Sequence, residues 1–444
     1  MHEKEGMDKP ENAEMGSGRD QVTGGGSSTG HRKERLSPRN LPTFSSLKNP
    51  VYRLFLGNTI GYTAGMQMEM TARNWLIYEL TRSPTMVGLK SLAVAGPMLF
   101  FSLFGGVIAD RVQKKHVLFI GQLLSAVISL GIALSLALGY LSAERGGSWW
   151  ILITAAAFHG TVSSLMLPSR QVMLYEIVGG QQILNAVSLN TLAMNGMRVL
   201  GPALAGFVID AFGITTAYYV ITGLYLSSSI IIPFLPRTSS TGLAGQGALS
   251  KIKEGLTYVR GDITVLLILV FALIGIVLAT PYLTLMPIVA ADVLNVGARG
   301  LGVMMSFVGI GAIGGSLVLA SLPDKKRGLL LIMSAICFAL ALIGFASSSS
   351  WYLSLSLLIL VGVGQTGLIT VAVAMLQDYS RDEYRARVMS IFMMEVGLMG
   401  FCGFGAALLT EIIEVRWVIG GFAMALVFLS ILTLGFVPRL RNLN

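Results

Sequence analysis

Apolar residues run in twelve long segments between residues 54 and 437, and short polar stretches separate these segments. Each segment approaches or exceeds about 20 residues, the length at which an α-helix crosses the hydrocarbon core of a bilayer. The apolar residues are continuous and do not alternate with polar ones, which favours helices over the strands of a β-barrel. The predicted spans are 54–79, 85–109, 116–140, 149–174, 186–210, 214–236, 263–290, 300–321, 328–347, 351–376, 388–411 and 416–437. The pattern therefore predicts an all-α membrane protein with 12 transmembrane helices in two six-helix bundles.

The polar stretches divide the chain into tails, bundles and a linker. Residues 1–48 are polar and rich in glycine and serine, which predicts a disordered cytoplasmic tail. We expect an N-terminal bundle at 49–236, a linker at 237–262, a C-terminal bundle at 263–438 and a short tail at 439–444. Between residues 248 and 260 apolar and basic residues recur at helical spacing, which predicts an amphipathic helix on the cytoplasmic membrane face. We expect the first span, rather than a cleaved signal peptide, to direct insertion.

The composition agrees with a membrane protein and excludes other classes. Hydrophobic residues make up 53% of the chain and charged residues only 12%, with a mean hydropathy of +0.70. A soluble domain carries roughly 25% charge. The net charge of +9 does not indicate nucleic-acid binding, because the basic residues gather at alternate loops and not on one surface.

The distribution of basic residues predicts the topology. Loops on one predicted side carry several Lys and Arg, whereas those on the other carry single residues such as Arg82, Arg145 and Arg299. Because cytoplasmic loops are enriched in Lys and Arg, we expect both termini in the cytoplasm and the protein in the cell membrane. The basic loops contain Arg111, Lys114 and Lys115; Lys251, Lys253 and Arg260; Lys325, Lys326 and Arg327; Arg381, Arg385 and Arg387; and Arg439 and Arg441.

The loop after the second span has a recognisable sequence. It places Gly106, Asp110 and Arg111 ahead of Lys114 and Lys115. This pattern resembles the loop between helices two and three of the major facilitator superfamily of transporters, although Gln113 stands where that loop usually has glycine. The resemblance implies alternating access and usually a monomer. It also implies a gating loop, in which Asp110 contacts the start of the eleventh span near Arg385 and Arg387. The remaining interpretation is that the loop only enforces topology.

The fifth span contains Gly201, Pro202 and Gly206 after Arg198. This stretch resembles the motif of antiporters in the same superfamily. Further stretches, from Trp75 to Pro84 and from Pro168 to Gln171, resemble the bacterial branch that includes the enterobactin exporter and macrolide efflux permeases. Glycine packing and a proline bend alone would also explain the motif.

Candidate coupling residues lie inside the spans. The chain has no phosphate-binding loop for ATP and no metal-binding motif, so we expect a transporter and not an enzyme, without cofactors and driven by a proton gradient. Proton coupling needs a titratable group within the bundle. Glu69 is the first candidate, and Glu395 and His159 are the others. A static ion pair of Glu69 with Arg73, four residues later, is the competing interpretation.

Arg198 lies in the middle of the fifth span, where a charge requires a partner. The sequence leaves open a pair with Glu69, a pair with Glu395, or contact with an anionic substrate. Polar side chains within spans mark a candidate substrate cavity, namely Gln67, Asn58, Asn195 and Gln365. We expect Lys90 to extend its ammonium group to the external face. We expect Asp210, Asp292 and Glu411, at helix ends, to be solvated.

These features predict a secondary transporter that exports small amphipathic molecules, such as drugs or siderophore-like metabolites, by proton antiport. A facilitator or importer of a polar solute, or a lysolipid translocator, remains the alternative on the same fold. The expected partners are a small-molecule substrate and the lipid bilayer, and nucleic acid is not among them.

Overall fold

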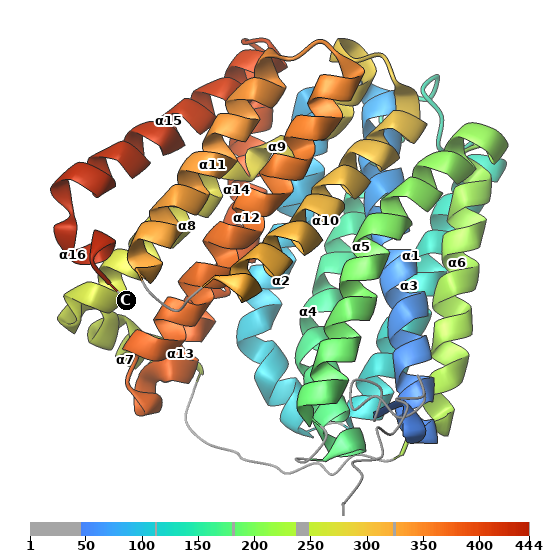
Figure 1. Cartoon of the computed structure of the whole chain (residues 1–444). Coiled ribbons are helices and arrows are strands. Elements are labelled where there is room, and N and C mark those ends of the chain that lie inside the picture. The colour runs from blue at the N-terminus through green and yellow to red at the C-terminus, as the bar shows by residue number, and fades with distance from the viewer. Residues whose placement is uncertain (1–45, 112, 180–182, 237–247, 323–325, 444) are drawn as a thin grey trace, which may run out of the picture. The chain divides into compact units, whose positions relative to one another are not determined.

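The computed structural model describes residues 46–443 except 112, 180–182, 237–247 and 323–325, and for 102–111 and 248–253 it describes the backbone only. Helices form this part of the chain (Figure 1). The first half contains α1 (Pro50–Thr81), α2 (Pro84–Arg111), α3 (Lys114–Ala137), α4 (Trp150–Val178), α5 (Ile183–Phe212), α6 (Ile214–Ile231) and η4 (Ile232–Phe234). The linker helix α7 spans Ala248–Gly261. The second half contains α8 (Ile263–Ala279), α9 (Pro281–Ile288), η5 (Val289–Val293), α10 (Gly297–Ser321), α11 (Arg327–Ser347), α12 (Trp351–Tyr379), α13 (Asp382–Phe392), α14 (Glu395–Thr410), α15 (Val415–Phe436) and α16 (Pro438–Arg441).

Eleven of the helical segments in the described residues are long and apolar enough to cross a membrane, which confirms a multi-pass helical membrane protein. Helix α1 is not among the eleven, although it is 32 residues long. It buries polar groups inside the protein, including Glu69, Arg73 and Asn74. Its low apolarity therefore reflects burial against other helices, mainly α5 and α6. The count of twelve membrane helices stays a prediction.

Two predicted spans are broken helices. The predicted span 263–290 consists of α8, α9 and the π-helical turn η5. Pro281 starts α9, because proline lacks the N–H that would continue the α8 ladder. The predicted span 388–411 is divided into α13 and α14 at Met393 and Met394, and no proline lies at this break. Both regions nevertheless remain single candidate membrane spans, Ile263–Val293 and Asp382–Thr410, as predicted, each with a break inside it.

The spanning helices form two groups, α1–α6 and α8–α15, which meet along two helix pairs. Helix α2 packs against α14, and α5 packs against α10. Glycine permits the second approach: a Cβ added at Gly302 would lie 2.3 Å from the Pro202 carbonyl oxygen. We call the end where α1 begins and the chain terminates the near end, and the opposite end, where α1 meets α2, the far end (Figure 1). The predicted topology makes the near end cytoplasmic.

Helix α7 forms where the sequence predicts the linker helix, and it packs against α13. The rings of Tyr258 and Tyr384 stack with centroids 4.4 Å apart. Glu254 forms an ion pair of 2.9 Å with Arg387. The linker helix therefore contacts the protein and not only a membrane surface. Residues 1–45 of the predicted tail lie outside the described residues, and the N–H of Ser46 already donates to Oδ1 of Asn185 on α5.

Candidate coupling and substrate site

Glu69 is the centre of a buried polar cluster on α1. Its side chain is 2% exposed. Arg73, one helical turn later, forms an ion pair with it. The Tyr225 hydroxyl of α6 donates to Oε2 of Glu69 over 2.6 Å, and Nδ1 of His159 from α4 lies 3.4 Å from the same oxygen. The structure thus brings together two of the three predicted coupling candidates and confirms the Glu69–Arg73 pair.

Lys90 belongs to the same region and does not reach the far surface. Its side chain is buried, and its ammonium group donates to the side-chain oxygen of Asn74 on α1. The charges of Lys90 and Arg73 interact unfavourably. The expectation that Lys90 extends to the external face was wrong, because Asn74 provides a buried oxygen that neither residue's position in the sequence reveals.

A second buried cluster in the N-terminal bundle explains Asn58. Its amide pairs reciprocally with Gln122 of α3, at 3.0 and 3.2 Å, and also donates to the Ser228 carbonyl oxygen over 2.7 Å. Arg170 of α4 lies with its guanidinium 4.5 Å from the centre of the Tyr62 ring. This cluster fixes α1 to α3, α4 and α6, so Asn58 is packed inside one bundle and does not line a cavity between bundles.

The two clusters are joined by aromatic rings. Tyr62 and Tyr225 lie with ring centroids 5.6 Å apart, and Tyr225 contacts Glu69. Polar groups therefore follow one another along the inside of the N-terminal bundle. Tyr225 and Arg170 were not among the predicted site residues, although a basic residue inside the fourth predicted span was a visible signal for Arg170.

Arg198 lies on α5 at the junction of the two bundles and is exposed. Its backbone and that of Val199 contact Gly309 of α10. Its charge acts on the hydroxyl of Tyr282 on α9, which donates to Oε1 of Gln365 over 3.1 Å. Gln67 of α1 lies against Gly201, one turn from Arg198. Three predicted cavity residues thus lie near one another: Arg198, Gln67 and Gln365. Asn195 precedes Arg198 by one turn on α5.

The expected pairs of Arg198 with Glu69 or Glu395 do not form. Within the described residues Glu69 binds Arg73, and no acidic group lies within ion-pair distance of Arg198. Glu395 is the first residue of α14, directly after the break from α13, and its Oε2 is buried without a hydrogen-bond partner. No hydrogen bond or ion pair of the described residues joins Glu395 to the Glu69 cluster. Because Glu395 is buried, its role in proton coupling stays a prediction.

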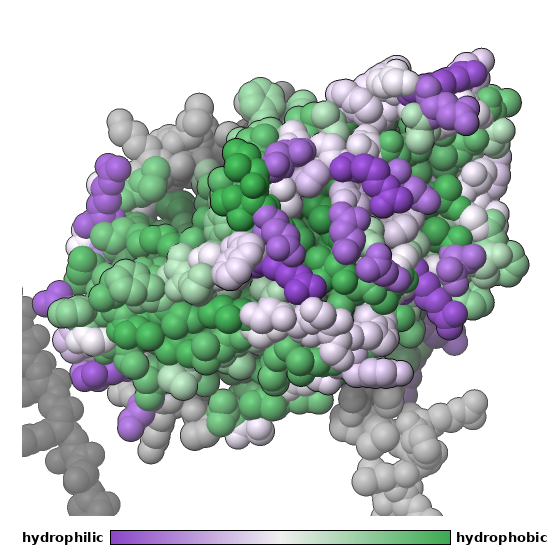
Figure 2. Space-filling view, turned by 90° about the horizontal axis from the view of Figure 1, so that it is seen from above, coloured by the Kyte–Doolittle hydropathy of each residue, from purple (hydrophilic) through white to green (hydrophobic). Residues whose placement is uncertain are grey.

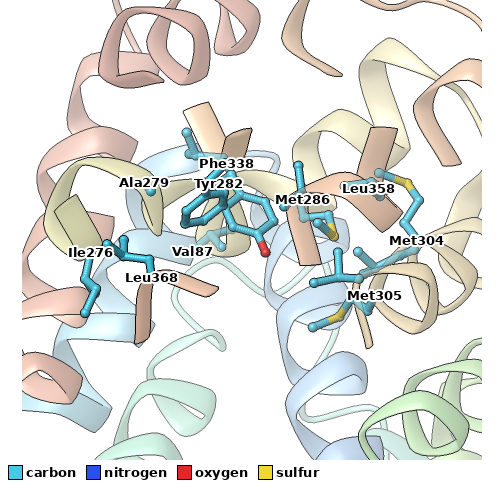
Figure 3. Close-up of a cluster of buried hydrophobic side chains, with 14 of the residues drawn as sticks. Val87, Ile276, Ala279, Tyr282, Met286, Met304, Met305, Phe338, Leu358 and Leu368 are labelled. Carbon is cyan, nitrogen blue, oxygen red and sulfur yellow. The ribbon is translucent and has the colours of Figure 1, made fainter. Parts of the chain in front are cut away.

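Tyr282 and several methionines belong to a cluster of buried hydrophobic side chains in the C-terminal half (Figure 3). Met286 of α9 and Met304 and Met305 of α10 lie on the same side of Tyr282 as its hydroxyl group, while Phe338 lies against the ring. The Tyr282 and Phe338 ring centroids are 6.1 Å apart and nearly perpendicular. Tyr282 and Met286 are fully buried. These side chains pack the helices together toward the far end.

Acidic groups at the far end join the two bundles. Tyr78 donates to Asp292, and Arg82 approaches the same carboxylate at 3.9 Å. Asp210 of α5 lies 3.9 Å from Arg299 of α10. Ser83 donates to Glu411 over 2.8 Å, and the Thr85 N–H donates to it over 3.2 Å. The hydrogen bonds from Ser83 and Thr85 lower the pKa of the Glu411 carboxyl. Asp210, Asp292 and Glu411 are exposed, as expected for acids at helix ends, and each also contacts basic or hydroxyl groups of the other bundle.

These contacts give the far end a closed arrangement. Two further hydrogen bonds join the bundles: the Ser306 hydroxyl donates to the Val199 carbonyl oxygen over 2.5 Å, and the hydroxyls of Ser91 and Thr284 lie 3.4 Å apart. The space-filling view onto this end shows hydrophilic side chains running in patches among hydrophobic ones (Figure 2).

The predicted gating loop is described only in part. The side chains of Gly106, Asp110 and Arg111 lie outside the described residues, whereas Lys114 is buried and Lys115 donates to the carbonyl oxygens of Pro233 and Leu235. The groups predicted to meet Asp110 have other partners. Arg385 pairs with Asp382 at 2.7 Å, and Arg387 pairs with Glu254. The contact of Asp110 with α13 stays a prediction.

A family model described as "Transmembrane secretion effector", within the major facilitator superfamily, matches residues 41–443. The chain belongs to this family. Its members are transporters and not enzymes, which agrees with the helical fold and the buried charges. The glycines of the predicted antiporter-like motif lie where α5 packs against other helices. Gly201 faces Gln67 of α1, and Gly206 faces the Ala298 and Arg299 backbone of α10.

Named relatives include siderophore transporters. The chain is 24% identical over 358 residues to the staphyloferrin A transporter of Staphylococcus aureus, covering 78% of this chain and 84% of that protein. It is 25% identical over 382 residues to the enterobactin exporter EntS of Citrobacter koseri, covering 82% and 87%. It is 29% identical over 188 residues to the uncharacterized MFS-type transporter YfiS of Bacillus subtilis, which covers 41% of this chain and only 42% of that protein.

The solved structures agree on the fold. The crystal structure of the nucleoside transporter NupG superposes with a TM-score of 0.69 at 12% identity, covering 87% of this chain and all of that one. At this identity the likeness shows the major facilitator fold and carries no information about the substrate.

Proposed function

We propose that this protein is a proton-coupled exporter of small amphipathic molecules, siderophore-like or drug-like, that works by alternating access. The observation that carries the proposal is the buried Glu69, which contacts Arg73, His159 and Tyr225 from three different helices. When a carboxylate at membrane depth takes up a proton, its ion pairs and hydrogen bonds to several partners change. Protonation can therefore bias a conformational equilibrium.

The relatives support the export direction. Both siderophore transporters align with most of this chain, and EntS is an exporter. The bonded far end supports alternation between two states, because exposed contacts such as Asp210–Arg299 can break at modest free-energy cost. A facilitator of a polar solute or a lysolipid translocator remains the second candidate, and the partly buried Gln67 and Gln365 favour polar recognition in either case.

The test uses proteoliposomes with an imposed proton gradient and a panel of fluorescent drugs and siderophore-like compounds. We expect gradient-driven transport by the wild type and none by Glu69→Gln. A transport rate that does not depend on the proton gradient would favour the facilitator. Coupled transport by Glu69→Gln at the wild-type rate would remove Glu69 from the mechanism.

The matched control is Glu414→Gln, which changes a carboxylate with an exposed side chain at the residue before the spanning helix α15, where it pairs with Arg416. It should leave transport unchanged. Equal loss in both variants would indicate impaired insertion and not a coupling role, and a measurement of the inserted protein distinguishes these cases.

A further inference from the structure

Basic side chains outnumber carboxylates within the spanning helices, among the residues whose side chains the structure describes. Among the described residues of the spanning segments, the basic side chains away from helix ends are Arg73, Lys90, Arg170 and Arg198, and the carboxylates are Glu69 and, at the start of α14, Glu395. Buried charges in a bilayer need compensation by an opposite charge, a polar group or water. The protein field at this depth therefore favours an anion.

Three of the four cations have partners inside the N-terminal bundle. Arg73 pairs with Glu69, and Lys90 donates to Asn74. Arg170 lies over the Tyr62 ring and contacts Oδ1 of Asn58 at 3.4 Å. Arg198 differs, because it lies at the junction of the bundles and no acidic group of the described residues pairs with it.

Arg198 is also too deep to reach a membrane surface. It lies near the middle of the 30-residue helix α5. At 1.5 Å per residue, each end of the helix is roughly 20 Å away. Arg198 is exposed and lies at the junction of the bundles, so a molecule that enters there can reach it.

We propose that Arg198 binds an anionic oxygen group, of the carboxylate class, on the transported molecule. A guanidinium offers paired N–H donors that match a carboxylate in two parallel hydrogen bonds. Asn195 lies one turn before Arg198 on α5, and Gln67 of α1 lies against Gly201, one turn after Arg198. Both side chains can provide further polar contacts. Exposed apolar side chains on the same helix, such as Leu192 and Leu200, provide apolar surface for the rest of an amphipathic anion. The inference rests on the proposed function and narrows its substrate to anions.

The experiment measures equilibrium binding to the purified full-length protein in nanodiscs. The probes are 2-naphthoate and 2-naphthamide, which have nearly the same shape and differ in charge. Hydrogen bonds to charged groups contribute about 1.5–3 kcal/mol, so we expect the wild type to prefer the carboxylate by roughly 10- to 100-fold. Arg198→Gln should reduce this ratio to about one, and Arg198→Lys should keep part of it because the charge remains.

The matched control is Arg299→Gln, which removes an exposed guanidinium at the far end and should leave the preference unchanged. Thermal unfolding of each variant shows whether the protein is folded. Adding an anionic lysolipid as a competitor separates two sources of the anion: displacement of naphthoate that depends on Arg198 supports the site and assigns it to a lipid headgroup.

Equal affinities for the two probes, absent binding of the carboxylate, or a preference that survives Arg198→Gln would overturn the inference. Transport measurements distinguish this failure from failure of the proposed function. Gradient-driven transport of neutral compounds without preference for anions leaves the function standing and removes the anion site. An Arg198-dependent preference for anions without gradient-driven transport supports the anion site and contradicts the proposed proton-coupled function.

Discussion

The hydroxyl group of Tyr225 on α6 donates a hydrogen bond of 2.6 Å to Oε2 of Glu69 on α1. The two residues are 156 positions apart in the chain. Both are fully buried, so the bond forms in a region of low dielectric, where a hydrogen bond to a charged group is strong. Any movement of α1 against α6, or protonation of Glu69, must change this contact.

Tyr225→Phe removes the donor and keeps the ring that packs against Tyr62. Loss of a hydrogen bond to a charged group costs about 1.5–3 kcal/mol. We expect gradient-driven transport to fall by roughly tenfold or more, while the amount of inserted protein stays the same. Tyr219→Phe, on the exposed side of the same helix, is the control and should keep the wild-type rate. An unchanged rate in Tyr225→Phe would show that this bond is not part of the cycle.

Asn58 was predicted to line the substrate cavity, and its contacts now predict a different effect. Asn58→Ala leaves the Gln122 amide and the Arg170 guanidinium without a common partner. Unsatisfied buried polar groups cost about 1–3 kcal/mol each. We expect a lower unfolding temperature with unchanged substrate preference, measured by thermal unfolding and by transport competition. Asn195→Ala should cost less stability. A change of preference in Asn58→Ala would restore the cavity interpretation.

Helix positions could be predicted from the sequence because hydropathy is a local property. The predicted spans 300–321 and 351–376 correspond to α10 (Gly297–Ser321) and α12 (Trp351–Tyr379). Pro281 was a visible signal for the break before α9. The break between α13 and α14 at Met393 and Met394 had no such signal, and hydropathy alone describes it as one apolar segment.

The candidate site could be predicted only in part, because partners across a bundle are set by packing. Glu69 and Arg73 share a helix face at spacing i, i+4, so their pair was readable. The contacts of Glu69 with Tyr225 and of Lys90 with Asn74 depend on how α1 lies against α6 and α2, and no periodicity encodes this. A polar residue inside a span shows that it needs a partner without naming that partner.

Gly302 controls the approach of α10 to α5. A Cβ there would lie 2.3 Å from the Pro202 carbonyl oxygen, so Gly302→Ala forces the two helices apart. We expect it to disfavour the state with a bonded far end and to slow transport. Distances between spin labels on the far ends of α5 and α10 should increase on average. Gly314→Ala on the same helix meets nothing within 4 Å and is the matched control. Equal distances in Gly302→Ala and the wild type would contradict this role.

Glu411 predicts a pH dependence of the far-end contacts. Hydrogen bonds from Ser83 and Thr85 lower the pKa of its carboxyl below the ordinary value of 4.5. The stabilisation of the bonded state is therefore fully present above the ordinary pKa and is lost as pH falls through the lowered value. Hydrogen exchange at the Thr85 amide, corrected for its intrinsic rate, should show protection at neutral pH and less below pH 4.5. Glu411→Gln should lack this transition, and its persistence there would assign the effect to another group.

The ion pair between Glu254 on α7 and Arg387 on α13 predicts how the linker helix is held. Arg387→Glu places two acids together, and because the pair is partly exposed we expect a loss of about 1 kcal/mol or less in the attachment of α7. Hydrogen exchange in α7 should rise in Arg387→Glu and return toward the wild-type rate in the exchange variant Glu254→Arg with Arg387→Glu. Arg385→Glu, which changes a guanidinium paired within α13, is the control and should leave exchange in α7 unchanged. If the double variant exchanges as fast as Arg387→Glu, the Tyr258–Tyr384 stack and not the ion pair holds α7 in place.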